Sequence, residues 1–329
     1  KMELKEGLEY LGGGFIQNTA VSSLTIPSTV TRSSDNTGVI AGAQALEEVI
    51  FAEGMQTIPN YICCNSNANQ VLTKVVIPET VTAIGSSAFK NCAGLKEMLF
   101  GKDVKVIGSA AFSGCSGLEK IEFQENDKMI IDTDGAKKLY PVEISDSAFS
   151  ACTNLKDIIL TENITKIGSG AFADCKQLKR ITMPKGVKTV GYNAFDGCSS
   201  LEEVELPEGL ERLECNFIKN TMVTSLTIPS TVKEVGFAMG VTNGASVLEE
   251  VIFADGMERI PDYICYSYYE NTTLTKVVIP ESVTQIGTSA FQNCSAITIY
   301  GYEGTYAQTY ATENQIPFVS LGEQIGDCE

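Results

Sequence analysis

The motif Ala-Phe-x-x-Cys recurs along this chain at a nearly constant spacing. Three of the steps between consecutive motif phenylalanines are 23 residues long. A fixed period of about 20 to 29 residues is typical of solenoids, in which short structural repeats stack in one direction. The phenylalanines of the motif are Phe89, Phe112, Phe149, Phe172, Phe195 and Phe291.

Each repeat also contains a segment with the pattern Leu-x-x-Ile-x-Leu/Phe, as at Leu118, Ile121 and Phe123. Apolar and polar residues alternate there, which predicts a half-buried strand. Stacked from repeat to repeat, these strands should form one parallel sheet. A proline or polar turn ends the strand, and a second extended piece, Val-x-x-Ile-Gly, follows before the Ala-Phe pair turns inward to fill the core.

Glycine closes the second extended piece in many repeats. Because glycine adopts backbone angles that other residues avoid, we expect such angles at these positions. The glycines concerned are Gly85, Gly108, Gly168, Gly191 and Gly287.

The cysteines of the motif occupy one equivalent position per repeat. A free cysteine can fill a narrow buried corner and donate weakly to a neighbouring carbonyl. Side chains at equivalent positions point the same way, which disfavours the alternative of stacked disulfides. The residues concerned are Cys92, Cys115, Cys152, Cys175, Cys198 and Cys294.

Counting by this pattern gives about twelve repeats, several of them irregular. The step from Phe112 to Phe149 is 37 residues, and the excess at residues 124–140 should leave the stack as a surface hairpin or loop. Cys63 and Cys265 stand where the motif has phenylalanine, and the first repeat uses Phe15 and Ile16 in the place of Ala-Phe.

A block of repeats is duplicated with an offset of 202 residues. Residues 23–30, 46–52 and 72–79 return at residues 225–232, 248–254 and 274–281 without a gap. Such a duplication requires that repeats be interchangeable modules on a line.

The pattern closes after Cys294. We expect a last short strand at Ile297 and Ile299, a short helix over residues 302–314 and a small strand at residues 317–319. The predicted organisation is a single solenoid over residues 1–321, with a cap at about residues 300–321 and a frayed tail at residues 322–329.

The full repeat, Leu-x-x-Ile-x-Ile-Pro-x-x-Val-x-x-Ile-Gly-x-x-Ala-Phe-x-x-Cys, resembles the BspA-like, or Treponema-type, leucine-rich repeat. The resemblance extends over about residues 7–319. It implies a leucine-rich-repeat solenoid: a right-handed, β-rich superhelix with a parallel sheet on one face and a short C-terminal helical cap. It also implies a bacterial cell-surface or secreted protein that adheres to host matrix proteins or to other cells. No fixed set of binding residues accompanies this repeat.

Composition excludes several kinds of chemistry and partner. The chain has no histidine, which removes Ser-His, Cys-His and His-metal sites. A net charge of −17 argues against nucleic acid and anionic membranes as partners. No apolar run approaches the length of a membrane span. Asp132 and Asp134 resemble the start of a calcium loop but lack its distal glutamate, so a polar turn is favoured. We expect no enzyme activity and no cofactor.

Two groups of residues are candidates for partner binding. Arg180, Glu203 and Glu205 should point outward from neighbouring strands, where Glu202, Glu203 and Glu205 are better read as solvated than as acid–base groups. Tyr266, Tyr268 and Tyr269, with Tyr263, cluster in a loop that could instead pack against its neighbours.

These features favour a monomeric, extracellular adhesion or binding module for a host or microbial surface protein or glycan. The alternative is a rigid spacer that presents another domain at the cell surface. No signal peptide is recognisable in the sequence.

Overall fold

The computed structural model describes residues 1–34, 37–66, 68–126, 129–131, 137–236 and 239–323. The chain divides into two compact units, an N-terminal unit of residues 1–178 and a C-terminal unit of residues 179–329. Each unit is a parallel-strand solenoid of the leucine-rich-repeat type, and the two together have about 13 turns, against the twelve predicted. The single solenoid over residues 1–321 stays a prediction.

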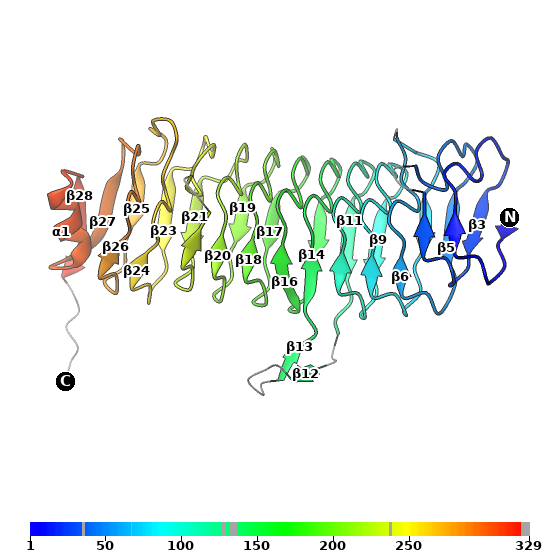
Figure 1. The fold of residues 1–329 in the computed structure, drawn as a ribbon. Coiled ribbons are helices and arrows are strands. Elements are labelled where there is room, and N and C mark those ends of the chain that lie inside the picture. The colour runs from blue at the N-terminus through cyan, green and yellow to red at the C-terminus, as the bar shows by residue number, and fades with distance from the viewer. Residues whose placement is uncertain (35–36, 67, 127–128, 132–136, 237–238, 324–329) are drawn as a thin grey trace. The chain divides into compact units, whose positions relative to one another are not determined.

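In the N-terminal unit the turns follow one another as a row (Figure 1). The strands predicted from the Leu-x-x-Ile pattern are parallel, as expected, but they form two sheets rather than one. The first sheet contains β1 (Met2–Glu3), β3 (Ser23–Ile26), β5 (Glu48–Phe51) and β7 (Lys74–Val76), and the second contains β9 (Glu97–Phe100), β11 (Lys120–Phe123) and β15 (Asp157–Ile159).

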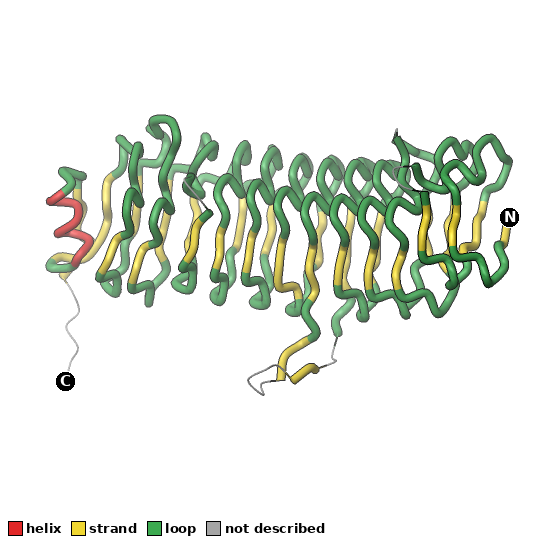
Figure 2. The backbone as a smooth tube through the Cα atoms, in the orientation of Figure 1, coloured by secondary structure: helices red, strands yellow, loops and turns green. Residues whose placement is uncertain are grey.

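The second extended piece of each repeat also forms parallel sheets, so each turn has strands on two sides joined by loops (Figure 2). The strands on this side are β2 (Tyr10–Leu11) paired with β4 (Arg32–Ser33), and, in spatial order, β6 (Thr57–Ile58), β8 (Ala83–Ile84), β10 (Val106–Ile107), β14 (Val142–Ile144) and β16 (Ile164–Ile167).

The C-terminal unit repeats this arrangement. On the first side, β17 (Arg180–Thr182) pairs with β19 (Glu203–Glu205), and a five-stranded sheet contains β21 (Ser225–Ile228), β23 (Glu250–Phe253), β25 (Lys276–Val278), β27 (Thr298–Glu303) and β28 (Phe318–Glu323). On the second side lie β18 (Thr189–Val190), β20 (Arg212–Leu213) and β22 (Glu234–Val235), and the pair β24 (Arg259–Ile260) and β26 (Gln285–Ile286).

The phenylalanines of the motif are buried, as predicted. In the N-terminal unit Phe89, Phe112, Phe149 and Phe172 form a column of stacked rings with centroids 5.1, 5.3 and 5.4 Å apart. Phe100 of β9 meets this column edge-on at Phe112, 5.5 Å away. Offset and edge contacts of this kind add stability beyond burial alone, so the aromatic column is the centre of the core.

The prediction for the glycines was wrong. Gly85 and Gly108 do not have positive φ; left-handed angles fall instead at Ser87, with φ of 53°, and Asn91, with φ of 62°. A Cβ on Gly85 would lie 2.6 Å from the carbonyl oxygen of Ile58, and one on Gly108 2.7 Å from that of Ile84. Glycine is therefore needed because successive turns approach closely, and not for its backbone angle.

The cysteines form the predicted ladder. Cys115 Sγ donates to the carbonyl oxygen of Phe89 at 3.1 Å, and Cys152 Sγ donates to that of Phe112 at 3.3 Å. The ten cysteines among the described residues are buried and form no disulfide. The thiols of Cys92, Cys175 and Cys294 make the same kind of bond, so these ladder thiols each satisfy a carbonyl of the preceding turn inside the core.

The long repeat carries the predicted surface hairpin. Strands β12 (Met129–Ile131) and β13 (Lys137–Leu139) pair antiparallel and project from the turns (Figure 1). The solenoid continues beneath them, because β14 pairs in parallel register with β10. Asp132 and Asp134, the candidate calcium loop, lie outside the described residues.

The C-terminal cap differs from prediction at its boundaries. The helix α1 (Tyr306–Glu313) begins four residues later than predicted, because β27 continues to Glu303 and pairs with β28. Strand β28 reaches Glu323, two residues into the segment predicted to be a tail, and residues 324–329 lie outside the described part.

Candidate functional site

The two groups of candidate residues are each brought together by the fold. Arg180 lies opposite Glu203 in the register of β17 and β19, and Thr182 lies opposite Glu205 and donates its hydroxyl to that carboxylate at 2.8 Å. Arg180, Glu203 and Glu205 are exposed. We call these three residues the strand face; they are solvated charges on neighbouring strands.

The tyrosine loop, residues 263–270, precedes β25. Tyr268 and Tyr269 are 62% and 77% exposed, with their rings in edge contact at 5.1 Å. Tyr263 and Tyr266 make a second edge contact at 6.0 Å, and Tyr266 is half-buried. Tyr266 is thus partly covered and contacts Tyr263 of its own loop, whereas Tyr268 and Tyr269 expose their rings to solvent.

A shallow polar hollow of about 250 Å³ adjoins this loop. Its wall includes Tyr269, Glu270 and Thr272 from the loop side and Asn243 and Ser246 from the preceding turn. Asn243 also accepts a hydrogen bond from the backbone N–H of Tyr268 at 3.2 Å. Among the described residues, no hydrogen bond, ion pair or ring contact joins the strand face to the tyrosine loop.

A third feature was not predicted and lies at the last turn. Within the solenoid, alternate backbone N–H groups of the Ala-Phe corner donate to the next turn. Ser87, Phe89 and Asn91 donate to the carbonyl oxygens of Ser109, Ala111 and Ser113 at 2.9, 2.7 and 2.8 Å. Intervening N–H groups close tight turns within the corner itself, as from Cys92 to Phe89 at 3.1 Å. The Ala-Phe corner of each turn therefore directs three backbone N–H groups toward the turn that follows it.

The equivalent donors of the last corner are Ser289, Phe291 and Asn293. Its inner turns are formed as in the other corners, and Ser289 and Asn293 have the same left-handed angles, with φ of 53° and 64°. No acceptor for these three N–H groups is present among the described residues. Phe291 is buried, Ser289 is half-buried and Asn293 is exposed. Buried backbone donors are almost always paired, so the unpaired N–H of Phe291 marks this corner as an unfinished edge.

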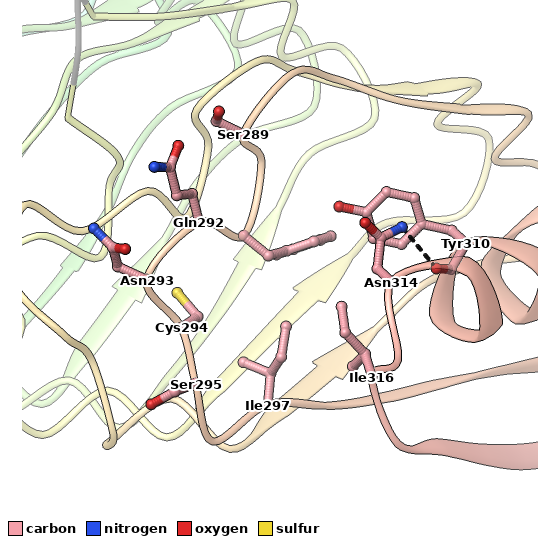
Figure 3. Close-up of a pocket in the computed structure, with 10 residues that line it drawn as sticks. Ser289, Gln292, Asn293, Cys294, Ser295, Ile297, Tyr310, Asn314 and Ile316 are labelled. Carbon is pink, nitrogen blue, oxygen red and sulfur yellow. Dashed lines mark hydrogen bonds between the residues drawn. The ribbon is translucent and has the colours of Figure 1, made fainter.

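A pocket of about 500 Å³ lies over this corner, between the last turn and α1 (Figure 3). We call it the end pocket. Phe291 and Ile297 line one side and Tyr310 and Ile316 the other, with the rings of Phe291 and Tyr310 in edge contact at 6.0 Å. Asn314 lies at the rim and donates to the carbonyl oxygen of Tyr310 at 2.9 Å. The lining carries no charged side chain.

The cap covers only part of the last turn. Strand β28 pairs with β27, and Ala307 and Ala311 of α1 are buried against it, so the strand side is complete. The Ala-Phe side has Tyr310, Asn314 and Ile316 above it and no further turn. Sequence reasoning missed the end pocket, although one signal was present: Phe291 belongs to the last Ala-Phe-x-x-Cys motif, and no further motif follows to cover it.

The ionisable groups offer little for catalysis. Burial raises the pKa of the Cys115 and Cys294 thiols to about 12, so both are protonated and poorly nucleophilic at neutral pH. Hydrogen bonds lower the pKa of Glu250, through Lys276, and of Asp262, through the backbone N–H of Thr288. A general acid would need a raised carboxyl pKa instead.

Two kinds of feature are absent from the part of the chain that the structure describes. No cluster of three or more histidine, cysteine, aspartate or glutamate side chains is placed to bind a metal ion. No described helix has the length and apolarity to cross a bilayer.

The fold and these surfaces define a leucine-rich-repeat solenoid that presents exposed faces. The chain belongs to the family described as the BspA type leucine rich repeat region, whose profile matches six copies over residues 1–72, 56–133, 140–239 and 243–311. Proteins of this family are repeat scaffolds, often at the cell surface and often binding, and typically without enzyme activity.

Solved structures show the same fold. A leucine-rich repeat protein from Bacteroides ovatus is 21% identical, with a TM-score of 0.54, and the alignment covers 88% of this chain and 72% of the other. The pneumococcal vaccine antigen PcpA is 19% identical, with a TM-score of 0.50, covering 92% of this chain and 80% of that one. No curated protein matches the chain.

Proposed function

We propose that this protein is a non-enzymatic, extracellular binding or adhesion module that recognises a protein or a glycan through the tyrosine loop and the strand face. The observation that carries the proposal is the exposure of Tyr268 and Tyr269, at 62% and 77%. Exposed tyrosines provide rigid contact area with a polar tip, and little side-chain entropy is lost when they bind.

The duplication supports a role outside folding for these rings. The positions of Tyr266, Tyr268 and Tyr269 in the first copy of the block hold Cys64, Ser66 and Asn67. The chain on either side is otherwise similar, and the first copy forms its strands without the tyrosines. Since the fold does not need them, their retention is best explained by contact with a partner.

The expected partner is a surface protein or glycan of a host or another microbe. The net charge of −17 opposes nucleic acid and anionic membranes. The polar hollow beside Tyr269, with hydroxyl and amide groups in its wall, suits a sugar or a polar peptide. An extracellular location and a monomeric state are part of this proposal. The location is supported by the cell-surface proteins among the relatives.

The test is attachment to matrix proteins, glycans and cells, first with the unmodified chain. The double variant Tyr268→Ser and Tyr269→Asn installs the residues of the first copy and should reduce binding at least tenfold. Arg180→Ala and Glu203→Ala should weaken it less, because exposed charges contribute modestly. If binding is absent, or if all these variants bind as the unmodified chain does, the proposal is wrong.

The spacer hypothesis is favoured by a different observation, the continuous backbone hydrogen bonding between turns. In each unit the N–H groups of one turn donate to the next along both sides, as from Cys63 to Ala88 at 2.7 Å. Such a stack resists bending. A chain that binds nothing but holds an attached reporter at a fixed distance from a surface would support the spacer instead.

A further inference from the structure

We propose that the end pocket binds an uncharged, extended peptide segment of a partner protein, which continues the solenoid by the equivalent of one Ala-Phe corner. This site lies one turn beyond the tyrosine loop, to which its wall is bonded from Asn293 Nδ2 to the carbonyl oxygen of Ser267 at 2.8 Å and from Ser295 Oγ to Glu270 at 2.7 Å. The inference goes beyond the proposed function because it assigns a different surface. The partner's carbonyl oxygens would accept from the N–H groups of Ser289, Phe291 and Asn293, and an aromatic side chain would lie in the end pocket against Tyr310 and Ile316.

The chain itself shows what such a corner binds. Ser87, Phe89 and Asn91 are the equivalents of Ser289, Phe291 and Asn293 at the offset of 202. They are covered by residues 109–115, Ser-Ala-Ala-Phe-Ser-Gly-Cys, through the three hydrogen bonds described above. The ring of Phe112 stacks on that of Phe89 at 5.1 Å, with an interplanar angle of 15°. The occupant in the first copy is therefore a short segment with small residues around one phenylalanine.

The end pocket matches that occupant in size and in chemistry. Its volume of about 500 Å³ is within the range of about 300 to 1,000 Å³ typical of ligand sites. Phe291, Ile297 and Ile316 provide an apolar floor, and Tyr310 meets the edge of the Phe291 ring. In a chain with a net charge of −17 the lining is uncharged, which favours a neutral segment over an acidic or a basic one.

Backbone pairing is the expected source of affinity. Addition of an extended segment to an unpaired edge satisfies donors that otherwise have only water, and side-chain pockets supply selectivity. In the last turn Ser289 and Asn293 have left-handed backbone angles, as the equivalent residues of the covered corners do. The directions of the three N–H groups are therefore fixed before binding. A preorganised edge loses little entropy when it is occupied.

The probe is a peptide with the sequence of residues 108–117 and the change Cys115→Ser, which prevents oxidation. We expect it to bind the full chain with a dissociation constant of roughly 0.1 to 1 mM, measured by fluorescence anisotropy. The same peptide with Phe112→Ala should bind at least tenfold more weakly. Failure to bind at millimolar concentration, or equal binding of the two peptides, would overturn the proposal.

Matched protein variants locate the site. Gln292 lines the end pocket and is exposed, and its equivalent in the first copy is Lys90, exposed over a corner that is already covered. Gln292→Trp should weaken peptide binding at least tenfold, and Lys90→Trp should leave it unchanged. Equal effects of the two substitutions would contradict the site.

Hydrogen–deuterium exchange tests the backbone claim without any variant. In the free chain the segment 288–294 should exchange faster than the segment 86–92, whose alternate N–H groups are bonded to the next turn. The peptide should slow exchange in 288–294 and leave 86–92 unchanged. If the peptide gives no protection, the last corner is not a binding site. If acetate alone gives the same protection, the corner is a simple anion site and the peptide proposal is wrong.

Discussion

The two copies of the duplicated block carry similar sequences in different settings. Leu8, Phe15 and Phe89 of the first copy correspond to Leu210, Phe217 and Phe291 of the second. Leu8 and Phe15 are 38% and 46% exposed, whereas Leu210 and Phe217 are fully buried. At the other end of the block, Phe89 is covered by a full turn and is fully buried, whereas Phe291 is covered by α1 and Ile316 and is 6% exposed.

The difference shows that the burial of a residue in this fold depends on whether a neighbouring turn covers it, and not on the residue type. Phe195 donates its backbone N–H to the carbonyl oxygen of Phe217 at 2.8 Å, so the turn before Phe217 covers it. In a solenoid each repeat contacts only its neighbours. Equivalent residues such as Phe15 and Phe217 therefore lie at the surface in one copy and in the core in the other. Such pairs can be compared directly by mutation.

The largest contrast is expected between Phe217→Ala and Phe15→Ala. Removing a fully buried phenylalanine should cost about 3 to 5 kcal/mol of unfolding free energy, because a cavity remains. The same change at the half-exposed Phe15 should cost less than about 1 kcal/mol. Urea unfolding followed by circular dichroism measures both. Similar costs for the two variants would break the comparison.

The close approach of turns predicts equal penalties in the two copies. A Cβ at Gly85 would lie 2.6 Å from the backbone nitrogen of Asn60, and one at Gly287 2.5 Å from that of Asp262. Gly85→Ala and Gly287→Ala should each destabilise by about 1 to 3 kcal/mol, as overpacking does. Gly101→Ala is the control, since its nearest contact would be 3.9 Å away. A neutral result at Gly85 or Gly287 in the unfolding midpoint would contradict the account.

Alkaline pH should weaken the N-terminal and the C-terminal unit in the same manner. Burial raises the pKa of Cys115 and of Cys294 from 9.0 to about 12. Stability from these protonated thiols is complete below pH 9 and is lost as pH rises toward 12, because only the unfolded thiols ionise in that window. Each thiol should cost about 1.4 kcal/mol per pH unit there.

The measurement is the unfolding free energy at pH 8, 9, 10 and 11 for the unmodified chain and for Cys115→Ala and Cys294→Ala. Each variant should show a shallower alkaline decline than the parent by the same amount, and the difference from the parent removes the contribution of other titrating groups. A variant with the parent's slope would show that its thiol is not buried in the protonated form.

The smallest effect is expected in the tyrosine loop. Tyr268→Ser and Tyr269→Asn should change the unfolding free energy by no more than about 0.5 kcal/mol, because both rings are largely exposed. Thermal unfolding at neutral pH checks this. A larger loss would mean that the rings support the turn, and the argument for their role in binding would fall.

Much of the fold follows directly from the sequence, because the period places equivalent residues in equivalent environments. The inward phenylalanines, the thiols bonded to carbonyls and the hairpin of the long repeat were all predicted in this way. The role of the glycines was not, since a recurring glycine does not distinguish a special backbone angle from a close approach. Only the distance from Gly85 to the preceding turn decides between the two.

A candidate site could be predicted from the sequence when its residues are close in the chain or lie in adjacent repeats. The register of Arg180 with Glu203 follows from the strand pattern, and the clustering of Tyr268 with Tyr269 follows from adjacency. The end pocket depends instead on where α1 lies over Phe291, which is set by the pairing of β27 with β28. A long-range arrangement of that kind leaves no mark in a single repeat.

The constant offset of 202 residues has a consequence for how such a chain changes length. A recombination event that joins residue 51 to residue 254 would remove one complete set of turns in frame and place Phe51 where Phe253 stood. Every hydrogen bond across the new junction would have a counterpart already present in the parent. Lineages carrying this gene can therefore shorten or extend the protein by whole turns in single genetic steps. The contact between the newly adjacent turns needs no further mutation.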